Sequence, residues 1–148
     1  MPRLPRALAA LLTCLALALP ALPAMAQDNP IIARMTEFAA AYNAGDAAAI
    51  AAIYSPDGVI LPPGQPAIQG REAIADHYAQ AFAAGAGDLQ FRVIEIIAYE
   101  ARAVEFGETI VTLGDQRILG RYMHYWEAIG DDILLARDMY QVLSVQTP

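Results

Sequence analysis

Residues 120–142, GRYMHYWEAIGDDILLARDMYQV, form two apolar runs separated by Gly130-Asp131. Apolar and polar residues tend to alternate within each run, as in a strand, where successive side chains point to opposite faces. A Gly-Asp pair between two such runs is typical of a tight hairpin turn. We therefore predict two antiparallel strands, over residues 116–129 and 132–146.

The same two-residue period extends upstream of this hairpin. It predicts strands over residues 89–101 and 103–113, with breaks at Ala101-Arg102 and Gly114-Asp115, and a brief strand at Val59–Leu61. A proline-rich stretch, residues 62–66, follows that brief strand and predicts a loop.

The first part of the domain has a helical period instead. Asn29-Pro30 is a good helix start, and the apolar residues Ile31, Met35, Phe38, Ala39 and Tyr42 then form one stripe. Gly45 ends this helix, Asp46 caps a second short helix that runs to Ile53, and a third lies between Gly70 and Gly85. Helices followed by a run of antiparallel strands predict an α+β domain.

The N-terminus has the features of an exported protein. Arg3 and Arg6 precede an apolar run over residues 7–19, and Ala24-Met25-Ala26 supplies the small residues of a cleavage site. We predict a secretory signal peptide over 1–26 and a single domain over 27–148, periplasmic or secreted and not held in a membrane after cleavage.

The composition of the mature chain excludes several kinds of site. Its only cysteine, Cys14, lies in the signal peptide, which excludes disulfides and thiolate chemistry. Seven Arg against sixteen Asp and Glu give a net charge of −9, so we expect no nucleic-acid partner. His77 and His124 lack metal-site spacing and no Gly-rich phosphate loop is present, so we expect no metal and no cofactor.

Three stretches carry a resemblance to a known family: AAAYNAGDAAAIAAIYSPDGVILPPG (39–64), IQGREAIADHYAQAF (68–82) and the hairpin at 120–142. Together they resemble the nuclear transport factor 2-like superfamily, in its SnoaL-like and ketosteroid-isomerase-like branch. The resemblance implies a cone-like curved antiparallel sheet wrapped around about three N-terminal helices. It also implies a pocket at the wide end of the cone and a dimeric protein.

The resemblance does not extend to the catalytic groups of the steroid isomerases. Their helix-1 tyrosine corresponds to Phe38, their carboxylate base falls near Pro62, and their oxyanion acid falls on Met123. Pocket tyrosines of that branch are matched by Tyr54 and Tyr78. The resemblance therefore implies a pocket that is kept without the isomerase groups.

Asp138 is the candidate catalytic residue, because alternation places it on an apolar face with Leu134, Ala136, Tyr140 and Val142. A carboxylate there must be paired or have a raised pKa. A tight Gly130-Asp131 turn pairs residues whose numbers sum to about 261, which sets Met123 opposite Asp138 and Arg121 diagonal to it. Arg121 would then either fix the strand register or orient a pocket acid or base.

The same alternation assigns the other aromatic residues of this strand to the opposite face. Tyr122, His124 and Trp126 would there form an outer layer or an interface. The candidate ligand-binding residues are Tyr42, Tyr54, Tyr78, Arg121, Met123, Tyr125 and Tyr140.

Three functions remain open. The first is binding of a small, largely apolar molecule in the cone. The second is acid–base catalysis, as in an isomerase or cyclase, with Asp138 as proton carrier and Tyr125 or Tyr140 as helper. The third is an interaction module, since both faces of several strands are apolar, which also predicts a homodimer.

Overall fold

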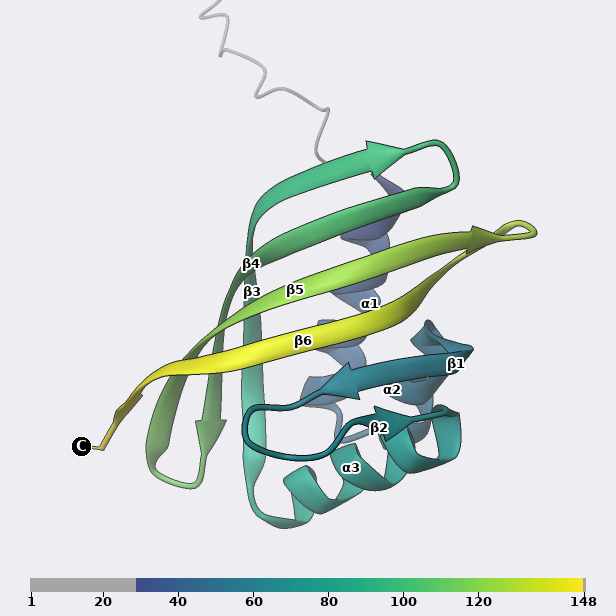
Figure 1. Cartoon of the computed structure of the whole chain (residues 1–148). Coiled ribbons are helices and arrows are strands. Elements are labelled where there is room, and N and C mark those ends of the chain that lie inside the picture. Colours follow the sequence, from purple (N-terminus) through teal and green to yellow (C-terminus); the bar gives the residue numbers. More distant parts are fainter. Residues whose placement is uncertain (1–28, 148) are drawn as a thin grey trace, which may run out of the picture.

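The computed structural model describes residues 29–147, so the predicted signal peptide lies outside the described residues. The helices are α1 (Pro30–Asn43), α2 (Ala47–Ile53) and α3 (Arg71–Ala83). The strands are β1 (Tyr54–Leu61), β2 (Ile68–Gln69), β3 (Ala86–Tyr99), β4 (Arg102–Leu113), β5 (Gln116–Ile129) and β6 (Asp132–Gln146). They form one curved six-stranded sheet in the order β2-β1-β6-β5-β4-β3, with the helices on its inner side (Figure 1). The predicted α+β class is confirmed.

Capping residues set the starts of the first two helices, as the sequence predicted. The side chain of Asn29 accepts a hydrogen bond from the Ile31 N–H at 2.9 Å, and Pro30 occupies the first turn of α1. The side chain of Asp46 accepts from the Ala49 N–H at 2.9 Å at the start of α2. The apolar stripe of α1 (Ile31, Met35, Phe38 and Tyr42) is buried against the sheet and the other helices.

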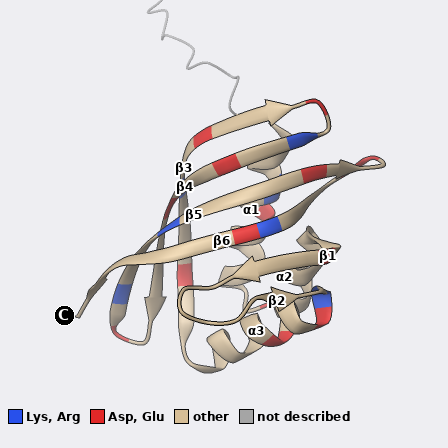
Figure 2. Cartoon of the chain, viewed as in Figure 1, with Lys and Arg blue, Asp and Glu red and all other residues tan. Residues whose placement is uncertain are grey.

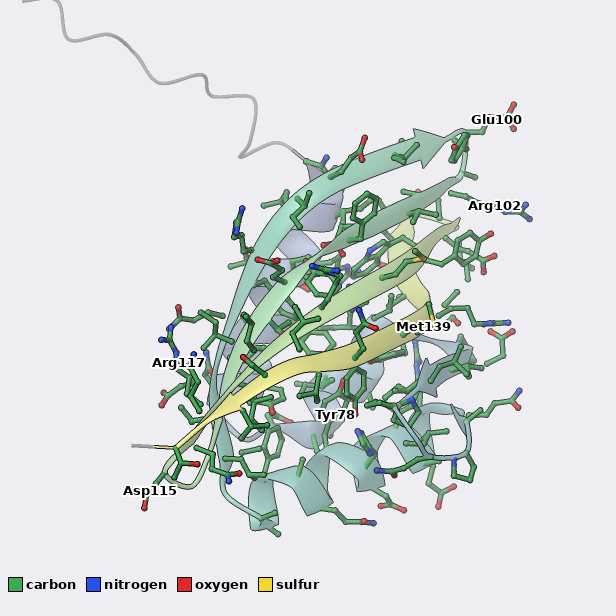
Figure 3. The ribbon with its side chains drawn as sticks, turned by 60° about the vertical axis from the view of Figure 1, so that its left-hand side comes forward. Tyr78, Glu100, Arg102, Asp115, Arg117 and Met139 are labelled. Carbon is green, nitrogen blue, oxygen red and sulfur yellow. The ribbon has the colours of Figure 1, made fainter. Side chains whose placement is uncertain are left out.

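The sheet is antiparallel except for one pair of strands. β3, β4, β5 and β6 follow one another as hairpins, while β1 lies parallel to β6 and antiparallel to β2. β1 is longer than the brief strand predicted at Val59–Leu61, and β2 was not predicted. The hairpin ends carry charged side chains, Glu100 and Arg102 at one end of the sheet and Asp115 and Arg117 at the other (Figure 3).

A β-bulge in β6 decides which side chains enter the interior. Close to the Gly130-Asp131 turn the predicted register holds, with Trp126 opposite Leu135. Ala136 then has no partner on β5, and beyond it Tyr125 lies opposite Arg137 and His124 opposite Asp138. Because side chains alternate with a period of two, this one extra residue exchanges the two faces.

The bulge makes the predicted faces of β5 wrong. Tyr122, His124 and Trp126 point inward and are buried, whereas they were expected on the outer face. Met123, expected opposite Asp138, is instead 46% exposed and lies opposite Met139. The sequence could not show this exchange, because a small residue such as Ala136 fits either face.

The outer face of the sheet carries charged and apolar side chains together. Figure 2 shows charged residues spread along the long strands. Glu108 on β4 forms ion pairs with Arg92 on β3 and Arg121 on β5. Within residues 29–147, no helix is long and apolar enough to cross a membrane.

Candidate functional site

A cavity of about 430 Å³ lies between α1, α3 and the inner face of the sheet. Most of its wall is apolar, contributed by residues such as Phe38, Leu89 and Val111. The titratable side chains in the wall are those of Tyr42, His77, Tyr78, Tyr122, His124, Asp138 and Tyr140. Pro63 and Gln65 bring the proline-rich loop to the same cavity, so this loop forms part of its wall.

Asp138 is the one carboxyl group in the described wall of the cavity, and it is almost fully buried. Its Oδ2 atom accepts a hydrogen bond of 2.6 Å from the Tyr54 hydroxyl. The Tyr54 hydroxyl also lies 3.1 Å from that of Tyr78, which projects from α3 toward the sheet (Figure 3). The second oxygen, Oδ1, lies 3.4 Å from Nε2 of His124.

His124 connects Asp138 to a second buried carboxyl group, Glu105. Nδ1 of His124 lies 2.9 Å from Oε2 of Glu105, which is fully buried on β4 directly opposite His124. Oε2 also accepts a longer hydrogen bond of 3.5 Å from the Trp126 indole, and Oε1 accepts one from the Tyr122 hydroxyl. Both oxygens of Glu105 are therefore occupied by donors from β5.

Gly107 leaves the space that this arrangement needs. A Cβ at Gly107 would lie 2.7 Å from the Tyr122 hydroxyl oxygen and 2.2 Å from the carbonyl oxygen of Arg92. The missing side chain lets β3 approach β4 closely and lets the Tyr122 ring pass over β4 toward Glu105.

The two carboxylates determine the protonation of His124. Burial by itself lowers the pKa of this imidazole, but the charges and hydrogen bonds of Asp138 and Glu105 more than offset that effect and raise the pKa to about 9. At neutral pH His124 is therefore an imidazolium between two carboxylates.

The neighbouring groups stay uncharged near neutral pH. Burial lowers the pKa of His77, and the charge of Asp138 opposes this only in part. Burial, followed by the charge of Asp138, raises the pKa of Tyr54 and of Tyr78 well above the usual value for a phenol. The same causes raise the pKa of Tyr140 to about 12.

The structure brings together some of the predicted site residues and separates others. Asp138, Tyr42, Tyr78 and Tyr140 line the cavity, and Tyr54 lies behind its wall in contact with Asp138. Arg121, Met123 and Tyr125 are absent from the wall, so their predicted place beside Asp138 was wrong. Arg121 instead lies 3.7 Å from Glu108 on the outer face.

Sequence reasoning missed Glu105 and rejected His124. One feature of the sequence could have identified Glu105. It lies between Ala103 and Gly107 in the two-residue alternation, so it is a single carboxyl group among small residues on the inner face of β4. Within residues 29–147 no group of three His, Cys, Asp or Glu side chains could hold a metal ion.

Comparison with known proteins places this chain in a family. The SnoaL-like domain family matches residues 35–135. A ketosteroid isomerase-like protein from Erwinia carotovora atroseptica SCRI1043 superposes with a TM-score of 0.68 at 23% identity, over 78% of this chain and 95% of the other.

Two further solved structures share the fold at lower identity. One is an NTF2-like protein with a cystatin-like fold from Novosphingobium aromaticivorans, with a TM-score of 0.67 at 16% identity, over 78% of this chain and 80% of the other. The other is a putative calcium/calmodulin-dependent protein kinase type II association domain from Thiobacillus denitrificans, with a TM-score of 0.67 at 19% identity, over 76% and 94%. No curated protein sequence matched this chain. The chain belongs to the SnoaL-like domain family, within the NTF2-like superfamily.

Proposed function

We propose that this protein binds a small, largely apolar molecule in the cavity between the helices and the sheet. The observation that carries the proposal is the cavity itself, about 430 Å³ with a mainly apolar wall and a few polar groups gathered around Asp138. Small-molecule sites typically have volumes of about 300–1,000 Å³, with a few polar groups that set the orientation of the ligand. A ligand with one polar end, directed at Asp138, suits this wall.

A cavity-filling substitution tests this proposal. Ala81 lies in the cavity wall on α3, while Ala79 is exposed on the same helix. The uncharged fluorescent probe N-phenyl-1-naphthylamine should bind the wild type and A79F but not A81F. Equal binding by A81F and A79F would contradict the proposal. Separately, native mass spectrometry of the wild-type protein, residues 27–148, would identify any small molecule that it retains on purification.

We also propose that the protein is exported and has the mature N-terminus Gln27. This proposal rests on the charged, apolar and small-residue segments of residues 1–26. Intact mass measurement of the protein from the periplasmic fraction of a bacterial host tests it. A protein that keeps residues 1–26 would contradict it.

A homodimer formed through the outer face of the sheet is proposed as the working assembly. Leu61, Met139 and Met123 lie in register on three adjacent strands, and each is more than 40% exposed. Exposed apolar patches of this kind mark interaction sites. Light scattering should show a dimer for the wild type and a monomer for the M123E/M139E double variant. Ile129→Glu, an equally exposed site at a hairpin end, should leave the dimer intact.

Acid–base catalysis is the second candidate function, because Asp138 and His124 both line the cavity and contact each other. Asp138 would carry the proton. Of the two predicted helper tyrosines, Tyr125 and Tyr140, Tyr140 is the one that lines the cavity. The test is deuterium incorporation next to the carbonyl of small ketones in D₂O, followed by NMR. Exchange should be lost in D138N and kept in Y125F. Exchange that persists in D138N would exclude Asp138 as the proton carrier.

A further inference from the structure

We propose that Glu105 is a positioning residue that holds His124 as an imidazolium and thereby keeps Asp138 as the proton acceptor of the cavity. This inference rests on the proposed acid–base function of the same cavity. Glu105 is outside the cavity wall, so it would act on a ligand only through His124.

The charge balance around Glu105 supports this proposal. A fully buried carboxylate is costly unless it is paired with a positive charge and hydrogen-bonded. The Tyr122 hydroxyl and the Trp126 indole donate to Glu105 but carry no charge. Among the described residues, the cationic partner within salt-bridge distance of Glu105 is His124. The imidazole must therefore carry both of its protons to complete the pairing.

The fixed orientation of the His124 ring supports the proposal as well. The ring packs against Phe38 of α1, Phe91 of β3 and Tyr122 of its own strand, with centroid separations of 6.4, 6.1 and 4.4 Å. None of these aromatic neighbours is a competing cation. With Nδ1 directed at Glu105, the other ring nitrogen faces Asp138.

The environment of Asp138 fits the same role. The groups around it are the His124 imidazolium on β5, the Tyr54 hydroxyl on β1, Tyr78 and His77 on α3, and Tyr140 on its own strand. The imidazolium and the Tyr54 hydroxyl both stabilise the ionised carboxylate. The separation of 3.4 Å between Oδ1 and Nε2 of His124 is longer than the 2.6 Å hydrogen bond to Oδ2, so Oδ1 is the less saturated oxygen.

This arrangement indicates a class of substrate. An ionised Asp138 can accept a proton from an O–H group or from a C–H next to a carbonyl. In the second case the C–H bond breaks, the proton moves to Asp138, and the electron pair remains on the substrate as an enolate. The substrate class is then a small, largely apolar carbonyl compound, with the imidazolium of His124 close to the charge that moves.

The test is an NMR titration of the histidine imidazoles. The chain has two histidines, so an H77Q variant assigns the signals of ¹⁵N-labelled His124. In the wild type, His124 should show two protonated ring nitrogens at pH 7.5. In E105Q the titration midpoint should fall by about one to three pH units, because an opposite charge in direct contact has been removed.

Two further variants separate positioning from general structure. E105D restores the charge on a shorter side chain and should recover part of the shift. E108Q removes a carboxylate on the outer face of the same strand and should leave the midpoint unchanged. A neutral His124 in the wild type at pH 7.5, or an unshifted midpoint in folded E105Q, would overturn the proposal. A neutral His124 in the wild-type spectrum would overturn the proposal even if E105Q does not fold.

The titration needs no ligand, so its outcome is separate from that of the proposed function. An imidazolium that depends on Glu105 supports the inference about charge, even if no ketone exchanges deuterium and the acid–base function fails. Deuterium exchange with a neutral His124 would support the acid–base function but overturn the role proposed for Glu105. Catalysis would then proceed without an imidazolium at this position.

Discussion

Asp138 lies directly opposite His124 across the β5–β6 pair, with its Oδ1 atom 3.4 Å from Nε2 of the imidazole. Both residues are buried, and both reach the cavity. Glu105 lies on the far side of the same ring, so the three side chains form a carboxylate–imidazolium–carboxylate row across β4, β5 and β6.

This row predicts that stability falls as the pH rises through the mildly alkaline range. His124 has a pKa of about 9 in the folded protein, compared with 6.5 for an ordinary histidine. Because the folded protein holds this proton more tightly, the stabilisation is complete below about pH 6.5 and is lost as the pH rises through about 9. Urea denaturation at pH 6, 7.5 and 9 should show a falling midpoint. H77Q should show a fall at least as steep, because the lowered pKa of His77 favours the folded state as the pH rises. A midpoint that stays flat would contradict the prediction.

Removing the Tyr54 hydroxyl should destabilise the protein. Tyr54→Phe leaves Oδ2 of the buried Asp138 without its 2.6 Å hydrogen bond. A lost bond of this kind should lower the free energy of unfolding by about 1–3 kcal/mol. Chemical denaturation measures this loss, and Tyr99→Phe, on a side chain that is 62% exposed, should change little. Equal effects of the two substitutions would show that the contact contributes nothing measurable.

Adding a methyl group at Gly107 should disrupt the packing between β3 and β4. The new Cβ would lie 2.2 Å from a backbone oxygen of Arg92, which cannot move aside as a side chain could. Overpacking of this kind costs about 1–3 kcal/mol or more. Gly87→Ala on the same strand pair is the control, because its Cβ would make an ordinary contact of 3.6 Å with Thr112. Thermal unfolding should separate the two variants clearly.

The cavity should prefer uncharged ligands to anionic ones of the same shape. Asp138 is the one carboxyl group in the described cavity wall, and a second carboxyl group, that of Glu105, lies behind His124. We expect 2-naphthol to bind at least about tenfold more tightly than 2-naphthoate at pH 7. The negative charge of 2-naphthoate would lie close to the carboxyl group of Asp138, and placing like charges together in a buried site is unfavourable. Isothermal titration calorimetry measures both affinities. D138N should narrow the difference, and tighter binding of 2-naphthoate by the wild type would contradict this view of the cavity.

Local sequence signals were sufficient to predict the helices, the long strands and most of the turns. Asn29-Pro30 and Asp46 predicted two helix starts because capping depends on a few neighbouring residues. The hairpin turns at Gly114 and Gly130 were located correctly for the same reason. The pairing of β1 with β6 could not be predicted in this way, since it joins residues far apart in the chain.

The candidate site was only partly predictable, and the reason is geometric. Asp138 was identified because a lone carboxylate on an apolar face is unusual, and it does line the cavity. Its partners were misplaced by one residue of register, so Arg121 and Met123 were predicted where His124 lies. Glu105 was missed because its importance comes from the residue opposite it, which a wrong register conceals.

Ala136, the unpaired residue of the β6 bulge, has a consequence for how this protein can vary. Loss of its single codon would remove the bulge and leave Asp138 opposite His124, because Arg137 would then follow Leu135 directly. Replacement by a larger residue would be the more disruptive change, because Ala136 is 1% exposed and a longer side chain would have to fit into packed interior. At this point the protein can therefore vary in strand length more readily than in side-chain size.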